Sequence, residues 1–126
     1  MIFITKATDN VMTAEENAIN YANAYVTRLM LRLGVQESEV KTPVSEIVQK
    51  LAELVALREQ AAALVGSDAT AYLEGVNADD IYNRKYKIYS DRVKQIENTI
   101  SYTDFMGADA EGRNKLFIGT IPINRA

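Results

Sequence analysis

Three stretches of the chain repeat apolar residues at steps of three and four, roughly Ala14 to Leu33, Ser45 to Val65 and Asp79 to Ser101. That spacing places side chains on one face of an α-helix, whereas a half-buried strand needs alternation at steps of two. At 126 residues the chain has the length of one domain. The sequence therefore predicts a mainly α fold, a bundle of three to four helices.

Residues that start and stop helices set the expected boundaries. Thr13 and Glu16 have the spacing of a capping box, and Gly34 supplies the residue that ends the first helix. Thr42-Pro43 combines a capping hydroxyl with a proline suited to the first helical position. We therefore expect the second helix to begin there and to end at Gly66. Because its apolar residues cover most of its circumference, we expect it at the centre of the bundle.

The third helix is expected to start at Asn77-Ala78-Asp79-Asp80, after a weakly indicated short helix over Asp68 to Glu74. Its apolar residues follow steps of four and three, which we call the tyrosine seam: Tyr82, Tyr86, Tyr89, Val93, Ile96 and Ile100. Such a seam packs lengthwise on another helix, and tyrosine hydroxyls favour a partly exposed position. We therefore expect an inter-subunit or packing face at Tyr82, Tyr86, Tyr89 and Val93.

Both ends of the chain carry apolar residues outside the helical pattern. Ile2 to Ile4 is β-branched and aromatic, which predicts a short N-terminal strand. The C-terminal end is interrupted by Gly119 and Pro122, so it is expected to be extended. Its apolar residues are Leu116, Phe117, Ile118, Ile121 and Ile123. Either it closes its own domain as a strand, or it lies on another chain. We favour the second, with a helical domain over 1–106 and a docking arm over 107–126.

Composition removes several classes of function. The chain has no cysteine and no histidine, which excludes disulfides and the usual catalytic triads and makes most zinc sites improbable. No phosphate-binding glycine loop is present. The start is too short for a signal peptide and no apolar run is long enough to span a membrane. We expect a soluble intracellular protein that is not an enzyme, has no cofactor and no metal, and does not bind membranes.

Charged residues in the helices have ordinary structural explanations. The third helix carries five cations, Arg84, Lys85, Lys87, Arg92 and Lys94. Interleaved acids and a net charge of −3 favour a solvated face over nucleic-acid contact. The acid pairs are Glu15 with Glu16 and Asp79 with Asp80. Each falls in an expected first helical turn, where acids complement the helix dipole.

The order of elements resembles the small head-tail adaptor, or connector, proteins of tailed bacteriophages. The likeness lies in a first helix over Ala14 to Leu33, an Ala- and Leu-rich helix over Ser45 to Val65, and a third with the texture Tyr82, Lys85, Tyr86 and Tyr89, followed by an arm. It implies a ring, commonly of twelve copies, located in the virion neck and assembled in the host cytoplasm.

By the same resemblance, the partners would be further copies of the chain, the portal protein, and a stopper or tail-terminator protein. Genome DNA would pass through the channel without sequence-specific binding. The resemblance makes Leu116, Phe117, Ile118, Ile121 and Ile123 the residues expected to dock on the portal.

Two other functions fit the same residues. One is a small helical regulator or inhibitor that dimerises along the tyrosine seam and acts by protein binding. The other is an all-helical enzyme whose pocket combines arginines, which bind carboxylates and phosphates, with a glutamate. The residues it would use are Arg28, Arg32, Arg84, Arg92 and Glu53.

Overall fold

The computed structural model describes residues 1–65 and 77–107, and within them the fold is mainly helical. In chain order the elements are α1 (Glu16–Arg32), the short 3-10 helix η1 (Glu37–Glu39), α2 (Glu46–Leu64), α4 (Asn77–Thr99) and α5 (Tyr102–Met106). The predicted helical bundle is confirmed. The expected short helix over Asp68 to Glu74 and the expected arm beyond Gly107 lie outside the described residues.

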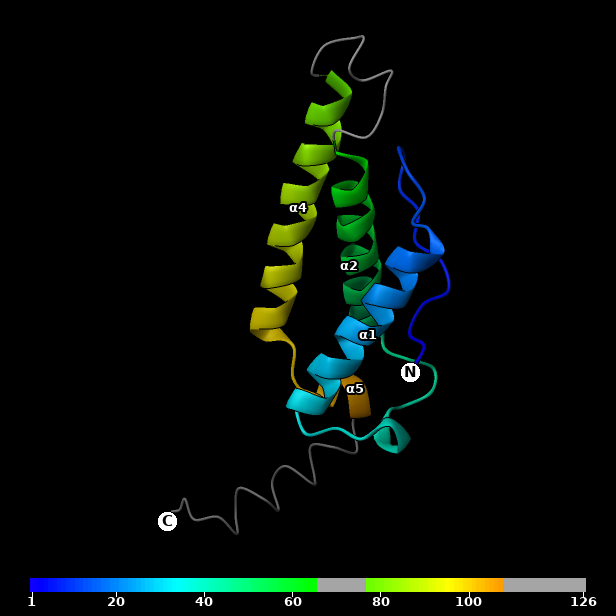
Figure 1. Cartoon of the computed structure of the whole chain (residues 1–126). Coiled ribbons are helices and arrows are strands. Elements are labelled where there is room, and N and C mark those ends of the chain that lie inside the picture. Colours follow the sequence, from blue (N-terminus) through cyan, green and yellow to red (C-terminus); the bar gives the residue numbers. More distant parts are fainter. Residues whose placement is uncertain (66–76, 108–126) are drawn as a thin grey trace.

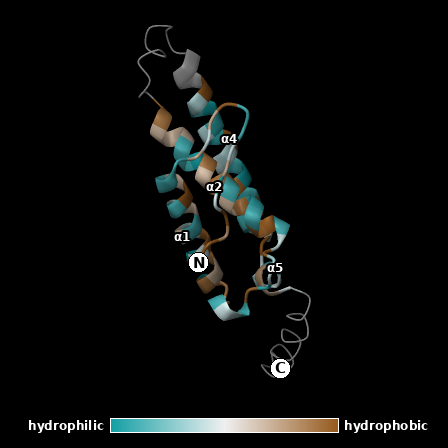
Figure 2. Cartoon of the chain, turned by 90° about the vertical axis from the view of Figure 1, so that its right-hand side faces the viewer, coloured by the Kyte–Doolittle hydropathy of each residue, from teal (hydrophilic) through white to brown (hydrophobic). Residues whose placement is uncertain are grey.

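Helix α2 is the central helix, as its nearly all-round apolar pattern predicts. It packs on α1 along one side and on α4 along another (Figure 1). Val48, Leu51 and Val55 on α2 are fully buried. In the view turned by 90°, α4 carries both hydrophilic and hydrophobic residues along its length, as expected of a helix with one face on the core (Figure 2).

The start of α1 differs from the prediction. Thr13 does not cap this helix: it pairs with Thr8 in an isolated bridge, and the amide of Ala14 donates to the carbonyl of Ala7 at 2.8 Å. The N-cap is Glu15, whose own side chain makes no capping bond. Its backbone amide instead donates to the side-chain oxygen of Gln60 on α2, at 2.9 Å. A residue from another helix therefore takes the role that we expected of Thr13.

The end of α1 follows the prediction in detail. Gly34 adopts a φ of 84°, in the left-handed region that favours glycine. Its amide donates to Leu31 and the amide of Val35 donates to Met30, which together form a Schellman motif. Val35 and Met30 are both buried, and such an apolar contact commonly accompanies this motif.

The start of α2 lies three residues beyond the predicted signal at Thr42-Pro43. The N-cap residue is Ser45, but its hydroxyl donates to the carbonyl of Asp104 at 2.7 Å instead of accepting from its own helix. The peptide bond before Pro43 is cis, and Pro43 lies in the loop. The helix start is therefore tied to α5, a contact that no local pattern reveals.

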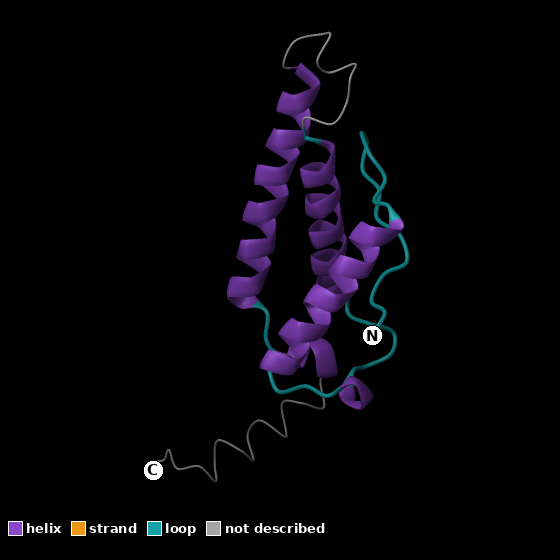
Figure 3. Ribbon diagram, in the orientation of Figure 1, coloured by secondary structure: helices purple, strands orange, loops and turns teal. Residues whose placement is uncertain are grey.

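The predicted N-terminal strand does not form, because a side chain takes the place of a neighbouring strand. Both Phe3 and Ile4 donate their amides to Asn23 Oδ1 on α1, at 2.8 and 3.1 Å. Asn23 Nδ2 returns a hydrogen bond to the carbonyl of Ile4 at 3.1 Å. Residues 1–14, which we call the N-terminal strap, run as loop beside α1, and no strand is drawn in the described part of the chain (Figure 3).

Helix α5 closes the end of the bundle at which α4 finishes (Figure 1). The carbonyl of Phe105 on α5 accepts a hydrogen bond at 2.9 Å from the amide of Lys41, which lies in the loop before α2. The Phe105 ring is buried and meets the ring of Phe3 edge to face, with centroids 6.2 Å apart. This contact joins the strap to the last described helix, so both ends of the described chain contribute to one core.

Candidate interaction surfaces

The structure separates the predicted face on α4 into buried and exposed parts. Tyr89 and Val93 are buried, Tyr82 is half-buried against the core, and Tyr86 is 39% exposed. The buried members of the seam belong to the core that α4 forms with α2. Val93 is therefore a packing residue within its own chain, and of these four positions Tyr86 is the one exposed to the surroundings.

Tyr89 also holds the N-terminal strap. Its hydroxyl donates a hydrogen bond to the carboxylate of Asp9, and Lys85 Nζ lies 3.1 Å from the same carboxylate oxygen, Oδ2. The other oxygen, Oδ1, accepts the amides of Val11 and Met12, each at 2.8 Å. Asp9 therefore closes a local turn and ties this turn to α4.

The electrostatics follow from that geometry. Burial by itself would raise the pKa of Asp9, but the hydrogen bonds from Tyr89, from the two amides and from Lys85 outweigh it and lower the pKa to about 2. Burial, followed by the hydrogen bond to Asp9, raises the pKa of Tyr89 to about 12. At neutral pH the pair is therefore a carboxylate that accepts from a neutral phenol.

Next to this contact lies a groove of about 550 Å³, which we call the charged groove. Strap, α2 and α4 all contribute to its lining: Lys6, Ala7, Thr8, Asp9, Lys50, Glu53, Leu54, Leu57, Tyr89 and Arg92. Lys6, Lys50 and Arg92 are exposed, whereas Leu54 and Leu57 are buried. The groove thus combines an apolar base with cationic side chains at its edge.

Exposed isoleucines occur on α2 and α4, the two helices that contribute to the charged groove. On α4, Ile81 is 42% and Ile88 is 49% exposed, and these two residues share a face with Lys85 and Arg92 at steps of four and three. On α2, Ile47 is 36% exposed and borders a shallow hollow that shares Lys50 and Glu53 with the groove. Exposed apolar side chains therefore neighbour Lys85 and Arg92 on α4 and Lys50 on α2.

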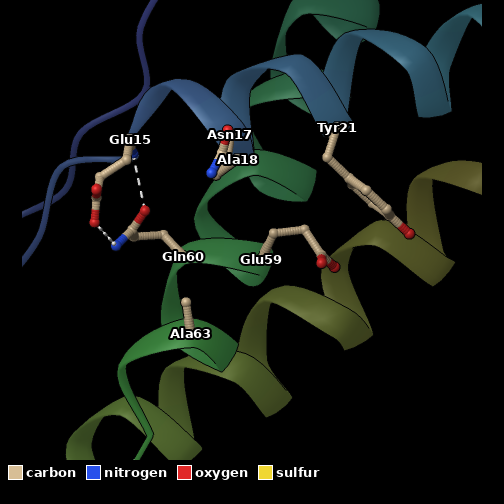
Figure 4. A pocket seen from close by; sticks show the side chains of 7 residues that line it. All are labelled: Glu15, Asn17, Ala18, Tyr21, Glu59, Gln60 and Ala63. Atoms are coloured by element: carbon tan, nitrogen blue, oxygen red, sulfur yellow. Dashed lines mark hydrogen bonds between the residues drawn. The ribbon is translucent and has the colours of Figure 1, made fainter. Parts of the chain in front are cut away.

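A second hollow, of about 260 Å³, lies between α1 and α2 and is shown in Figure 4. We call it the acidic hollow; it is lined by Glu15, Asn17, Ala18, Tyr21, Glu59, Gln60 and Ala63. Gln60 is buried and binds Glu15 twice, through the Glu15 amide and from its own Nε2 to Oε2 at 3.2 Å. Tyr21 is 47% exposed and lies at the end of the hollow away from Glu15 (Figure 4).

A separate cluster of side chains joins α1, α2 and α4. Tyr25 on α1 donates to Glu97 Oε2 on α4 at 2.6 Å, and the Arg58 guanidinium of α2 lies 5.3 Å from the centre of the Tyr25 ring. Burial, followed by the hydrogen bond to Glu97, raises the pKa of Tyr25. Arg58 also pairs with Glu59 at 3.3 Å. The cluster links α1 to α4 across the surface of α2.

The residues of the enzyme hypothesis do not come together as one site. Arg92 and Glu53 both line the charged groove, but Arg28 and Arg32 lie exposed on α1 and are not part of its lining. Over residues 1–65 and 77–107, no group of three or more acidic side chains has a geometry that could hold a metal ion. The predicted portal-docking residues, Leu116 to Ile123, lie outside the described residues.

Sequence reasoning missed the three polar residues that organise these surfaces: Asp9, Asn23 and Gln60. Two of them had a visible signal, because Asn23 and Gln60 are lone amides within otherwise apolar helical faces. Asp9 precedes a turn of the kind in which an aspartate accepts nearby amides. What could not be read from the sequence is which distant group each of them would bind.

Comparison with models of protein families, with curated proteins and with solved structures finds no match to this chain. In the described part of the chain, none of the helices combines the length and the apolar character that crossing a bilayer requires.

Proposed function

We propose that the chain is a structural head-tail adaptor of a tailed bacteriophage, a ring-forming subunit that lies beneath the portal and joins it to the stopper or tail. Its work is protein binding without catalysis. The proposal combines the resemblance in element order with the surface of the helical body. The observation that carries it is the pair Ile81 and Ile88, 42% and 49% exposed on one face of α4, which contact with a neighbouring subunit would cover.

The rest of the body suits an adaptor. A central helix with fully buried residues such as Val48 and Val55 resists deformation, because close-packed interiors transmit load and have few voids. A hydrogen bond from Tyr25 to Glu97 joins α1 to α4, and a hydrogen bond from Tyr89 to Asp9 joins α4 to the strap. A rigid body with surfaces of different character can hold two different neighbours at once.

The alternative function, a regulator that dimerises along the tyrosine seam, is less well supported. Tyr89 and Val93 would have to leave their contacts with the core before a partner helix could use them. Uncovering buried side chains of this size costs about 2 kcal/mol for each one. We therefore keep the adaptor as the proposed function.

The test is binding to the portal protein of the same virion. The full chain should co-sediment with assembled portal, and averaged electron micrographs should show an added ring of 14.0 kDa subunits. A chain truncated after Gly107 should keep its helical circular dichroism, since α1, α2, α4 and α5 all precede that residue, and should lose attachment. Failure of the full chain to bind portal contradicts the proposal.

A matched pair of substitutions separates the arm from the body. Phe117→Ser, in the proposed arm, should weaken portal attachment strongly. Ile88→Ser, on the exposed face of α4, should leave portal attachment in place and weaken contacts between subunits. Equal attachment by the Phe117→Ser variant and the unaltered chain would show that the arm is not the docking element.

A further inference from the structure

We propose that copies of the chain associate head to tail, with the charged groove of one copy seated against the acidic hollow of the next. This inference rests on the proposed function and names the two surfaces through which ring subunits touch. The occupant of the groove is thus a second copy of the same chain.

The groove has cations that its own chain does not neutralise in the contacts described. The groove is lined by two acidic residues, and one of them, Asp9, is already bound by Lys85 and Tyr89. Glu53 is then the one acidic residue of the described lining that can offset the charges of Lys6, Lys50 and Arg92. All three of these cations are exposed, so a second copy that covers the groove would meet their positive charge. A partner with unbalanced carboxylates fits this surface.

The acidic hollow has the opposite character. Its described lining holds Glu15 and Glu59 and includes no lysine or arginine. Glu59 is paired with neighbouring Arg58, whereas the Glu15 carboxylate accepts from the neutral amide of Gln60. Glu15 is exposed and carries the charge that remains to be balanced. The two surfaces are therefore complementary in sign.

Apolar contacts accompany the charges on both surfaces. Tyr21, 47% exposed, lines the acidic hollow. Ile47 borders the shallow hollow that shares Lys50 and Glu53 with the groove, and Ile88 lies four residues before Arg92 on α4. An aromatic ring with a polar tip packs well on isoleucine at an interface whose rim is charged. Charge steers the approach of two copies, and this apolar area holds them together.

The placement of the two surfaces favours a chain of copies. The groove uses the strap, α2 and α4, the hollow uses α1 and α2, and they have no residue in common. One copy can therefore engage a neighbour through each surface simultaneously. Such a heterologous contact closes into a ring when its rotation divides a full turn.

Cross-linking tests the contact directly, because the chain has no cysteine. A Lys50→Cys chain carries its thiol at the groove, and a Glu15→Cys chain carries one at the hollow; both positions are exposed. Oxidation of an equimolar mixture should yield a hetero-dimer, distinguished by a tag on one chain. Each variant alone, and a mixture of Lys50→Cys with Leu31→Cys, serves as the control and should yield several-fold less product.

Charge reversal provides an independent measurement. Lys6→Glu with Lys50→Glu in one chain, and Glu15→Lys with Glu59→Lys in another, should each weaken self-association at least about tenfold in low salt, since like charges then face each other. Mixing the two variants should restore association. Helical circular dichroism checks that each variant is folded.

Two results overturn the proposal: a hetero-dimer yield no greater than that of the controls, or reversal variants that associate like the unaltered chain. Neither result affects the proposed function if portal attachment is retained. Loss of portal attachment by the unaltered chain would instead contradict the adaptor function, even if copies associate as proposed. The two failures are therefore distinguishable.

Discussion

The side-chain amide of Asn23 binds the backbone of Ile4 from both sides, accepting its N–H at 3.1 Å and donating to its carbonyl at 3.1 Å. This is the pattern that an adjacent strand would offer, supplied here by a buried side chain of α1. The N-terminal strap is thereby held on the bundle without a sheet.

Asn23→Ala should destabilise the folded chain by about 2 to 4 kcal/mol, because it leaves buried backbone groups of Phe3 and Ile4 without partners. Urea unfolding gives the free energy, and hydrogen exchange should show faster loss of the Phe3 and Ile4 amide protons. Asn20→Ala, at an exposed position of the same helix, is the control and should change stability by less than about 0.5 kcal/mol. Equal effects of the two substitutions would contradict this role of Asn23.

The contact between Asp9 and Tyr89 predicts a dependence of stability on acid. Because the pKa of Asp9 is lowered from 3.8 to about 2, its contribution is complete above pH 3.8 and is lost as the pH falls towards 2. Because solvent screens this partly exposed carboxylate, the contribution is about 1 to 2 kcal/mol. In Asp9→Asn, stability should fall less steeply over this interval, as measured by urea unfolding at a series of pH values.

The same contact predicts a change in alkali. Because the pKa of Tyr89 is raised from 10.0 to about 12, the stabilisation is present below pH 10 and is lost as the pH rises through 12. Since the hydrogen bond between Tyr89 and Asp9 contributes to both pKa shifts, its energy is counted once. Asp91→Asn, at an exposed position of α4, is the control and should lose stability in acid and in alkali as the unaltered chain does. Parallel curves for Asp9→Asn and the unaltered chain would contradict the assignment.

The hydrogen bond from Tyr25 to Glu97 should couple α1 to α4. In a double-mutant cycle with Tyr25→Phe and Glu97→Gln, we expect a coupling of about 1 kcal/mol in the free energy of unfolding. Tyr21→Phe combined with Glu97→Gln is the matched cycle, because Tyr21 lies on the same helix but is largely exposed. A coupling within error of zero for Tyr25 would show that the bond contributes nothing to the folded state.

Gly34 should tolerate asparagine better than alanine. A Cβ at this position would meet no atom within 4 Å, so the cost of a side chain comes from the backbone, whose φ is 84°. Gly34→Ala should therefore cost about 1 to 2 kcal/mol, and Gly34→Asn should cost less, since asparagine adopts the left-handed conformation more readily. Thermal unfolding of both variants checks the order. A reversed order would mean that Gly34 is required for another reason.

The existence of the three long helices and the start of α4 at Asn77 could be predicted from the sequence, but the starts of α1 and α2 could not. The apolar spacing indicated α1, α2 and α4 correctly, and Gly34 marked the end of α1. The predicted starts at Thr13 and at Thr42-Pro43 were wrong. Thr13 pairs with Thr8 instead, and the actual N-cap residues, Glu15 and Ser45, bind partners far away in the chain. The short helix α5 escaped prediction, since its five residues are too few to show a period.

The candidate surfaces were predicted only in part. The sequence named Tyr89 as part of an inter-subunit or packing face and Arg92 as one of the cations of a solvated face. The structure buries Tyr89 against the core and places Arg92 at the edge of a groove with Lys6 and Lys50. Burial depends on which neighbour covers a side chain, and the period of one helix does not contain that information.

A helix satisfies its backbone hydrogen bonds within its own segment, so residues three and four apart carry enough information to specify it. The body of this chain was therefore readable before any contact between segments was known. Asp9 and Tyr89, however, stand 80 positions apart, and their hydrogen bond exists only once α2 has brought α4 beside the strap. The charged groove, the acidic hollow and the contact between Asp9 and Tyr89 belong to the packed molecule, because polar side chains reach distant partners only after the apolar core has set the distances.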